Sequence, residues 1–154
     1  MYFEDVELGV TRQLGSYTFT EEDMIRFSLK YDPQPFHIDP VAAKDSFYGG
    51  IIASGWHVAS IWMKLVIADG QKRSASAETR KGGGVSPGFL NLRWIKPTRP
   101  GMTLTYDTTT HEKIELKSRP DLGLIRTLNL AVDDSGETVM SFTGQGFWPR
   151  RLKG

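Results

Sequence analysis

Asp32 and His37 are the residues whose types and spacing most directly suggest catalysis. They lie five positions apart in a predicted loop, where prolines at 33, 35 and 40 stiffen the backbone. A carboxylate and an imidazole are the usual pair for general acid and base catalysis near neutral pH. We therefore interpret them as an acid–base pair that holds one water molecule. The spacing alone also fits a structural role, in which Asp32 caps a turn and His37 is a partly buried histidine with its hydrogen bonds satisfied.

A glycine-rich stretch before an apolar segment is the second candidate for chemistry. It reads Gly49-Gly-Ile-Ile-Ala-Ser-Gly55-Trp-His. Glycines near the start of a helix let a ligand approach the backbone, and the free N–H groups there favour negative charge. A thioester oxygen that becomes an enolate would be stabilised at such a position, as in an oxyanion hole. The alternative is that Ala53 and Gly55 are small only because a sheet packs on the helix.

The elements that must position these residues follow from hydrophobic periodicity and from glycine and proline. Thr20 and the acidic residues after it predict the start of a helix, which ends near Tyr31 because Pro33 disfavours helical geometry in the residue before it. Asp39 is expected to cap a short helix that begins at Pro40. A longer, more apolar helix is expected over 51–67, a mobile Gly-rich connection over 69–84, and strands over 10–19, 89–95, 102–116, 124–133 and 137–148.

This order of elements predicts a single α+β domain over residues 1–154. One apolar helix and a run of hairpin-connected strands indicate a curved antiparallel β-sheet wrapped around a long central α-helix. A sheet of this size has an exposed face or edge to cover, so we expect a homodimer or a larger homo-oligomer.

Composition excludes several classes of protein and site. The absence of cysteine excludes disulfides, thiolate metal sites and a cysteine nucleophile, and a net charge of +1 gives no electrostatic case for nucleic-acid binding. His57 and His111 have no metal-ligand neighbours at useful spacing, so no metal site is expected. The acidic N-terminus is unlike a signal peptide, and Lys64 interrupts the longest apolar stretch, so no membrane span is expected and the default location is cytoplasmic.

The two candidate segments, with a third one, also carry a resemblance to a known family. The quoted residues resemble the signature of the MaoC-like, (R)-specific enoyl-CoA hydratases, which reads Asp-x-Asn-Pro-x-His-x-Asp, then Ala, Phe and Ile-x-His-Gly-Met. A later stretch is similar to that family's Pro-x-Arg-Pro-Gly element at a strand end. The matching residues are Tyr31-Asp32-Pro-Gln34-Pro-Phe-His37-Ile-Asp39-Pro, Ala42-Ala43, Phe47, Ile52-Ala-Ser-Gly55-Trp and Trp94-Ile-Lys-Pro-Thr-Arg-Pro-Gly101.

The resemblance implies a hotdog fold and a hydratase/dehydratase that reversibly adds water to a trans-2-enoyl-CoA, giving an (R)-3-hydroxyacyl-CoA. It places the family's catalytic Asp and His on Asp32 and His37, and its oxyanion-hole glycine on Gly55. It implies no cofactor, because the acyl-CoA thioester already acidifies the carbon next to its carbonyl group. Lys96, Arg99 and the Arg80-Lys81 pair are candidates to approach a CoA phosphate.

The chain departs from the signature at three positions. Gln34 replaces Asn, Ser54 replaces His and Trp56 replaces Met. We expect Gln34, Ser54 and Ser60 to support the catalytic pair, and Trp56 and Phe47 to line the substrate pocket. Two other functions stay open: hotdog domains also host acyl-CoA thioesterases, and the departures would suit a non-catalytic acyl-CoA binding module.

Overall fold

Five strands form one antiparallel sheet, and the longest helix lies across one of its faces. The computed structural model describes residues 1–74 and 85–151. The strands are β1 (Thr11–Thr18), β2 (Phe89–Trp94), β3 (Thr103–Glu115), β4 (Leu122–Val132) and β5 (Thr138–Pro149), and their order in the sheet is β1-β3-β4-β5-β2. The helices are η1 (Phe3–Asp5), α1 (Glu21–Tyr31), α2 (Pro35–Ile38), α3 (Pro40–Lys44) and α4 (Gly55–Ser74). The predicted α+β architecture, with a sheet around a central helix, is confirmed.

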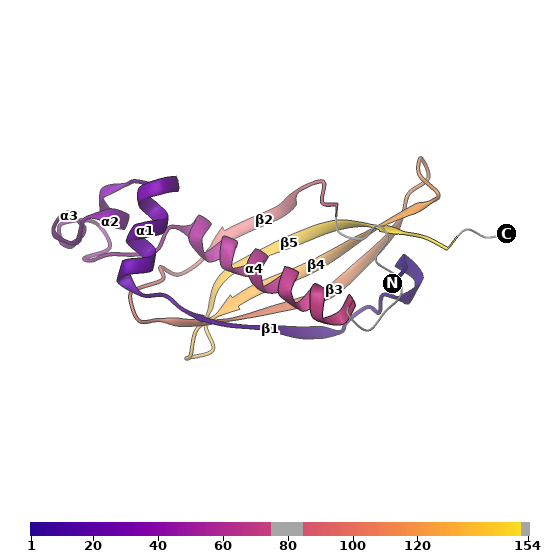
Figure 1. Ribbon diagram of the computed structural model, residues 1–154, viewed down its shortest axis with the longest axis horizontal. Helices are drawn as coiled ribbons and strands as arrows, with labels where there is room; N and C mark the ends of the chain where they lie inside the picture. The colour runs from indigo at the N-terminus through magenta and orange to yellow at the C-terminus, as the bar shows by residue number, and fades with distance from the viewer. Residues whose placement is uncertain (75–84, 152–154) are drawn as a thin grey trace.

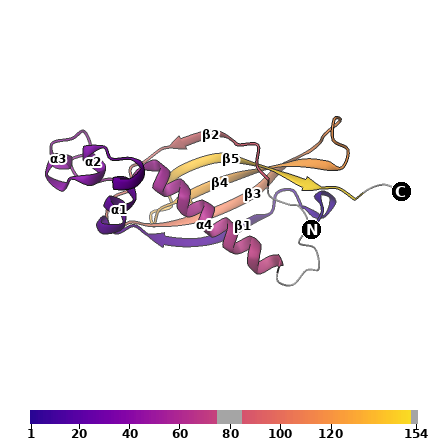
Figure 2. The same ribbon diagram turned by 45° about the horizontal axis from the view of Figure 1, so that its top comes forward.

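The helices lie at the two ends of the molecule and on one face of the sheet (Figure 1). Helices α1, α2 and α3 gather at one end of the molecule, whereas the N-terminus and the end of β5 lie at the other end (Figures 1 and 2). Helix α4 starts beside the three helices and crosses the sheet (Figure 1). None of the helices in the described ranges has the length and hydrophobicity needed to span a membrane.

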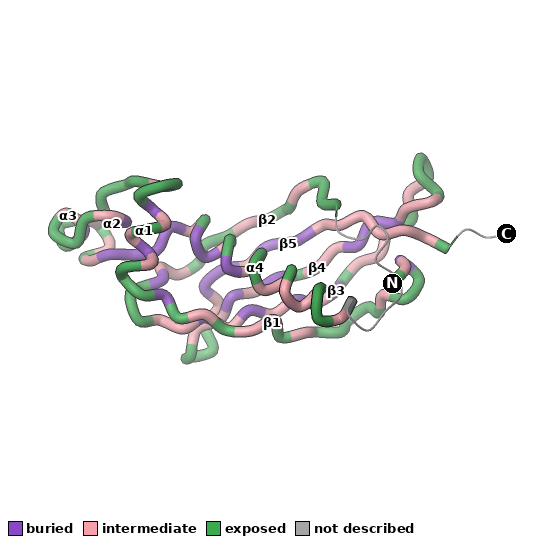
Figure 3. The backbone as a smooth tube through the Cα atoms, in the orientation of Figure 1, coloured by how far each residue is buried: buried purple, intermediate pink, exposed green. Residues whose placement is uncertain are grey.

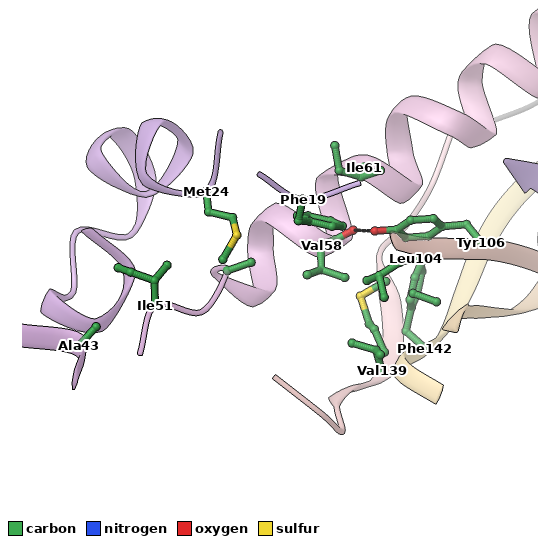
Figure 4. Close-up of a cluster of buried hydrophobic side chains, with 13 residues drawn as sticks. Phe19, Met24, Ala43, Ile51, Val58, Ile61, Leu104, Tyr106, Val139 and Phe142 are labelled. Carbon is green, nitrogen blue, oxygen red and sulfur yellow. Dashed lines mark hydrogen bonds between the residues drawn. The ribbon is translucent and has the colours of Figure 1, made fainter. Parts of the chain in front are cut away.

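The core lies between α4 and the sheet. Alternate residues of β3 are buried from Leu104 onward, as expected for a strand that turns one face to the core. Tyr106 pairs with Ala131 of β4, which pairs with Met140 of β5, and all three side chains are fully buried. Figure 3 shows buried positions along the strands and in the first turns of α4, and further ones among the small helices. The hydroxyl of Tyr106 donates to the carbonyl of Val58 at 3.0 Å, which ties α4 to β3 (Figure 4).

Helix α4 differs from the expected range at both ends. It begins at Gly55 and not at 51, because the buried residues before it bond outside the helix: Ile52 N–H donates to Phe36 O at 3.2 Å and Ala53 N–H to Thr98 O at 2.9 Å. Its polar last turns continue to Ser74, where a mobile connection was expected. The rest of that connection, 75–84, which includes Arg80 and Lys81, lies outside the described residues.

Helices α1 and α3 begin at the caps that the sequence predicted. Thr20 accepts from Asp23 N–H at 3.2 Å, and Asp39 accepts from Val41 N–H at 2.9 Å. The stretch after Asp32 was expected to be a loop, but one helical turn, α2, forms there. Proline is compatible with the first helical position, which explains why a Pro-rich segment can form this turn.

Candidate active site

Helix α2 brings His37 back against Asp32, which is the C-cap residue of α1. The Nε2 atom of His37 lies 3.2 Å from Oδ2 of Asp32. His37 is 4% exposed, and the side chain of Asp32 is 17% exposed. The structure therefore brings the two predicted catalytic residues into hydrogen-bond range, with the carboxylate in partial contact with solvent.

The other ring nitrogen of His37 fixes the tautomer of the imidazole. Nδ1 lies 2.8 Å from the carbonyl oxygen of Ile52, in the extended segment before α4. A carbonyl oxygen can only accept, so Nδ1 must carry a proton and donate it. The exchangeable proton of His37 is therefore the one at Nε2, which faces Asp32.

The environment of Asp32 favours its ionised form. Burial of the carboxyl group alone would raise its pKa, but hydrogen bonds from the Gln34 amide and the Ser54 hydroxyl, together with the nearby His37, lower the pKa below its usual range. Gln34 Nε2 donates to Oδ1 of Asp32 at 2.7 Å. The two supporting residues that depart from the signature, Gln34 and Ser54, thus both act on the carboxylate.

Gly55 is the first residue of α4, and no described residue accepts its N–H. A Cβ built at Gly55 would lie 2.3–2.6 Å from three atoms of the Trp94 indole ring, so only glycine fits against this ring. The rings of Trp56 and Trp94 meet edge to face with centroids 5.0 Å apart, and Phe89 lies 6.5 Å from Trp56. We call these three half-exposed rings the aromatic surface. A free N–H at a helix start, flanked by the aromatic surface, could hold a thioester oxygen beside the dyad.

The comparisons with known proteins place the chain in a family. A family model described as MaoC like domain matches residues 7–127. The chain belongs to the MaoC-like domain family. The chain is similar to a MaoC-like dehydratase from Rhodospirillum rubrum whose crystal structure is known. The two sequences are 31% identical, and the structures superpose with a TM-score of 0.83 over 99% of each chain. The (R)-hydratase of A. caviae shares the hotdog fold at 20% identity, with a TM-score of 0.70 over 95% of this chain and 99% of that one.

Among curated proteins, the MaoC-like domain is similar to Protein MaoC of Klebsiella aerogenes, with 30% identity over 73% of this chain. It spans 31% of the length of that relative, and 50% of the length of a second curated relative, YdeM of Bacillus subtilis. The family and the hotdog fold inferred from the signature residues are thereby confirmed.

The contacts that the structure shows for two of the predicted site residues of the MaoC-like domain are with residues other than Asp32 and His37. The hydroxyl of Ser60 donates to the carbonyl of His57 at 2.8 Å, one turn back along its own helix. Phe47 is 99% exposed, and its ring contact is with the neighbouring Tyr48. Their roles in support and in substrate binding therefore stay predictions.

Two groups at this site were not identified from the sequence. The carbonyl of Ile52 fixes His37, and Trp94 covers Gly55. Of the two cations proposed for a CoA phosphate that lie in described residues, Lys96 is engaged by Asp133 at 2.6 Å and by Glu137 at 2.5 Å, whereas Arg99 has a guanidinium nitrogen 3.9 Å from a Cβ built at Gly50. The roles of Lys96 and Arg99 toward a CoA phosphate therefore stay predictions.

His57 of the MaoC-like domain packs within a cluster of aromatic rings. Its ring stacks on Phe27 with centroids 4.6 Å apart, and the rings of Tyr17 and Phe19 meet it edge to face. Burial is the main reason that the pKa of His57 is lowered, although the Asp23 charge opposes the shift. Its Nδ1 is buried with no hydrogen-bond partner among the described residues, so no hydrogen bond at this nitrogen would stabilise a protonated ring.

We expect His57 to make the domain less stable in mild acid. A histidine whose folded pKa lies below its unfolded value of about 6.5 contributes its full stability above that pH, and the contribution falls as the pH drops through it. Urea unfolding at pH 7.5 and 5.0 measures the effect. His57→Phe, which keeps an aromatic ring, should lose less stability than wild type between these values, whereas His111→Phe, at an exposed position, should behave like wild type. Equal losses in wild type and His57→Phe would contradict this explanation.

Proposed function

We propose that this MaoC-like domain reversibly adds water across the double bond of a trans-2-enoyl-CoA to give an (R)-3-hydroxyacyl-CoA. Membership of the MaoC-like dehydratase family supports the hydratase/dehydratase role. The observation that carries the proposal is the 3.2 Å contact between His37 Nε2 and Asp32 Oδ2. A carboxylate held ionised next to an imidazole with a fixed tautomer is suited to moving a proton to or from one water molecule.

In the proposed reaction the dyad begins with Asp32 as the carboxylate and His37 as the imidazolium, with protons on both Nδ1 and Nε2. Asp32 takes a proton from water as the water oxygen bonds to Cβ, and the double-bond electrons move toward the thioester carbonyl. The N–H of Gly55 stabilises the resulting enolate oxygen. His37 then delivers its proton to Cα, and the proton on Asp32 returns to Nε2 across the short contact between them. One water molecule is consumed, and the dyad ends in its starting state.

The proposal also includes the cofactor requirement, the contact with the acyl group, the oligomeric state and the location of the protein. No cofactor is needed, because the thioester itself stabilises the negative charge that develops at Cα. The aromatic surface beside Gly55 is proposed to contact the acyl group, with Trp56 as the predicted pocket residue. We further propose that the protein works as a homodimer or larger homo-oligomer in the cytoplasm.

Dehydration of the two 3-hydroxyacyl-CoA enantiomers tests this function from the product side. The absorbance of the conjugated enoyl thioester should appear with the (R) enantiomer and not with the (S) enantiomer. A thiol reagent in the same sample should detect no free CoA. Release of CoA from a saturated acyl-CoA, without dehydration of either enantiomer, would show a thioesterase instead. Binding of both enantiomers without conversion would indicate a binding module.

A further inference from the structure

Four consecutive residues before and at the start of α4, from Ile52 to Gly55, run alongside the proposed reaction centre. The carbonyl of Ile52 fixes His37, and Gly55 presents its free N–H. Between them, Ala53 N–H bonds to the carbonyl of Thr98, which anchors the segment to the chain after β2. Ser54 is fully buried in this segment, with 0% exposure. Its side chain is therefore held at the centre of the site by backbone that cannot shift freely.

The hydroxyl of Ser54 accepts one hydrogen bond and keeps its own hydrogen free to donate. Its oxygen accepts the N–H of Trp56 at 3.2 Å, so the lone pair on that side is occupied. The hydroxyl hydrogen is free to reach the carboxylate of Asp32, and this hydrogen bond is among the causes that lower the pKa of Asp32. Buried hydroxyls in this chain are not all bonded in this way, since those of Ser28 and Thr98 have no partner among the described residues.

We propose that Ser54 is a positioning residue that fixes the Asp32 carboxylate against His37. Gln34 also donates to this carboxylate, but Gln34 is exposed, so water can replace its amide. No water can readily replace a donor that is fully buried, and a hydrogen bond to a charged group contributes more than a neutral one. Ser54 thus holds the orientation of Asp32 while the proton moves between Oδ2 and Nε2. The kinetic consequence rests on the proposed hydratase function.

Ser54→Ala tests this role without any assay of turnover. The pKa of the Asp32 carboxyl can be followed by NMR titration of its ¹³C signal in the purified protein. Loss of the donor should move that pKa upward from the wild-type value. Ser28→Ala is the matched control, because it also deletes a fully buried serine hydroxyl but one without a partner. Ser28→Ala should leave the Asp32 pKa unchanged, and an unchanged pKa in Ser54→Ala would overturn the proposed contact.

Kinetics with a trans-2-enoyl-CoA then test whether the contact matters for the reaction. We expect kcat of Ser54→Ala to fall about tenfold or more, KM to stay within about twofold, and the acidic limb of the kcat/KM profile to move to higher pH. Ser28→Ala should keep the wild-type profile. A shifted pKa with wild-type kcat would overturn the positioning role. If wild type itself has no activity, the proposed function fails, and the NMR titration still decides whether Ser54 holds Asp32.

Discussion

His37→Ala is expected to lower kcat for hydration of a trans-2-enoyl-CoA by about 10²–10⁴-fold. The variant removes Nε2, the atom that delivers a proton to Cα in the proposed reaction. Asp32→Asn should have a similar effect, because an amide cannot take a proton from water although it keeps the shape of the carboxylate and an oxygen to accept from Gln34. Steady-state kinetics on both variants provides the measurement.

Two controls distinguish a loss of catalysis from a loss of folding or a general effect of removing a histidine. His111→Ala changes an exposed histidine of β3, away from the dyad, and should keep wild-type kcat. Thermal unfolding should show that the dyad variants remain folded. The double variant should be about as slow as the slower single variant, because residues that act as a unit are not additive. Near-wild-type turnover in either single variant would contradict the acid–base mechanism.

Gly55→Ala is expected to lower both kcat and stability. Its Cβ would lie 2.3 Å from the nearest atom of the Trp94 ring, so the ring or the start of α4 must move. Because the Gly55 N–H is the proposed oxyanion donor, displacement of this backbone should lower kcat by about tenfold or more. The cost in unfolding free energy should be on the order of 1–3 kcal/mol, as for other overpacked sites.

Gly70→Ala is a matched control, because Gly70 lies on the same helix with no atom within 4 Å of a built Cβ. This variant should be slightly more stable than wild type, by up to about 1 kcal/mol, since alanine is the better helix former. Adding Trp94→Ala to Gly55→Ala removes the atoms that clash and should restore part of the lost stability. If Gly55→Ala behaves like Gly70→Ala, Trp94 does not constrain this position.

The parts of the fold that could be predicted are those with local signals. The start and end of α1 follow from Thr20 as a cap and from Pro33 after the last turn, and both lie within a few residues of the predicted place. The pairing of Asp32 with His37 could be proposed because both lie on one short, Pro-rich segment. The turn before β5 likewise follows from Asp134-Ser-Gly, where Gly136 has a positive φ of 86°.

The parts that could not be predicted depend on contacts between distant segments. Residues 51–54 look helical in their composition, but their backbone bonds to Phe36 and Thr98, so α4 starts later. The role of Ile52 in fixing His37 is carried by a backbone carbonyl, which has no signature in residue type. The packing of Trp94 on Gly55 joins β2 to α4, and no spacing rule relates positions so far apart.

The supporting residues show the same distinction. Ser54 and Gln34 were recognised as departures from a signature, but only the structure shows that Gln34 donates to the carboxylate of Asp32 and that Ser54 is among the groups that lower its pKa. Ser60 was grouped with them because it lies on the same helix, but its hydroxyl bonds to its own helix backbone. The residue types were therefore sufficient to nominate the site, and the three-dimensional contacts separate the residues that touch the dyad from those that do not.

The most direct test of the proposed function is loss of enoyl-thioester absorbance with a panel of trans-2-enoyl-CoAs of increasing chain length. Free thiol is measured in the same samples, and His37→Ala is run beside wild type. The proposed function predicts that wild type removes the absorbance of at least one substrate, releases no CoA, and loses this activity when His37 is replaced. No loss across the panel, or a loss that persists in His37→Ala, would contradict it.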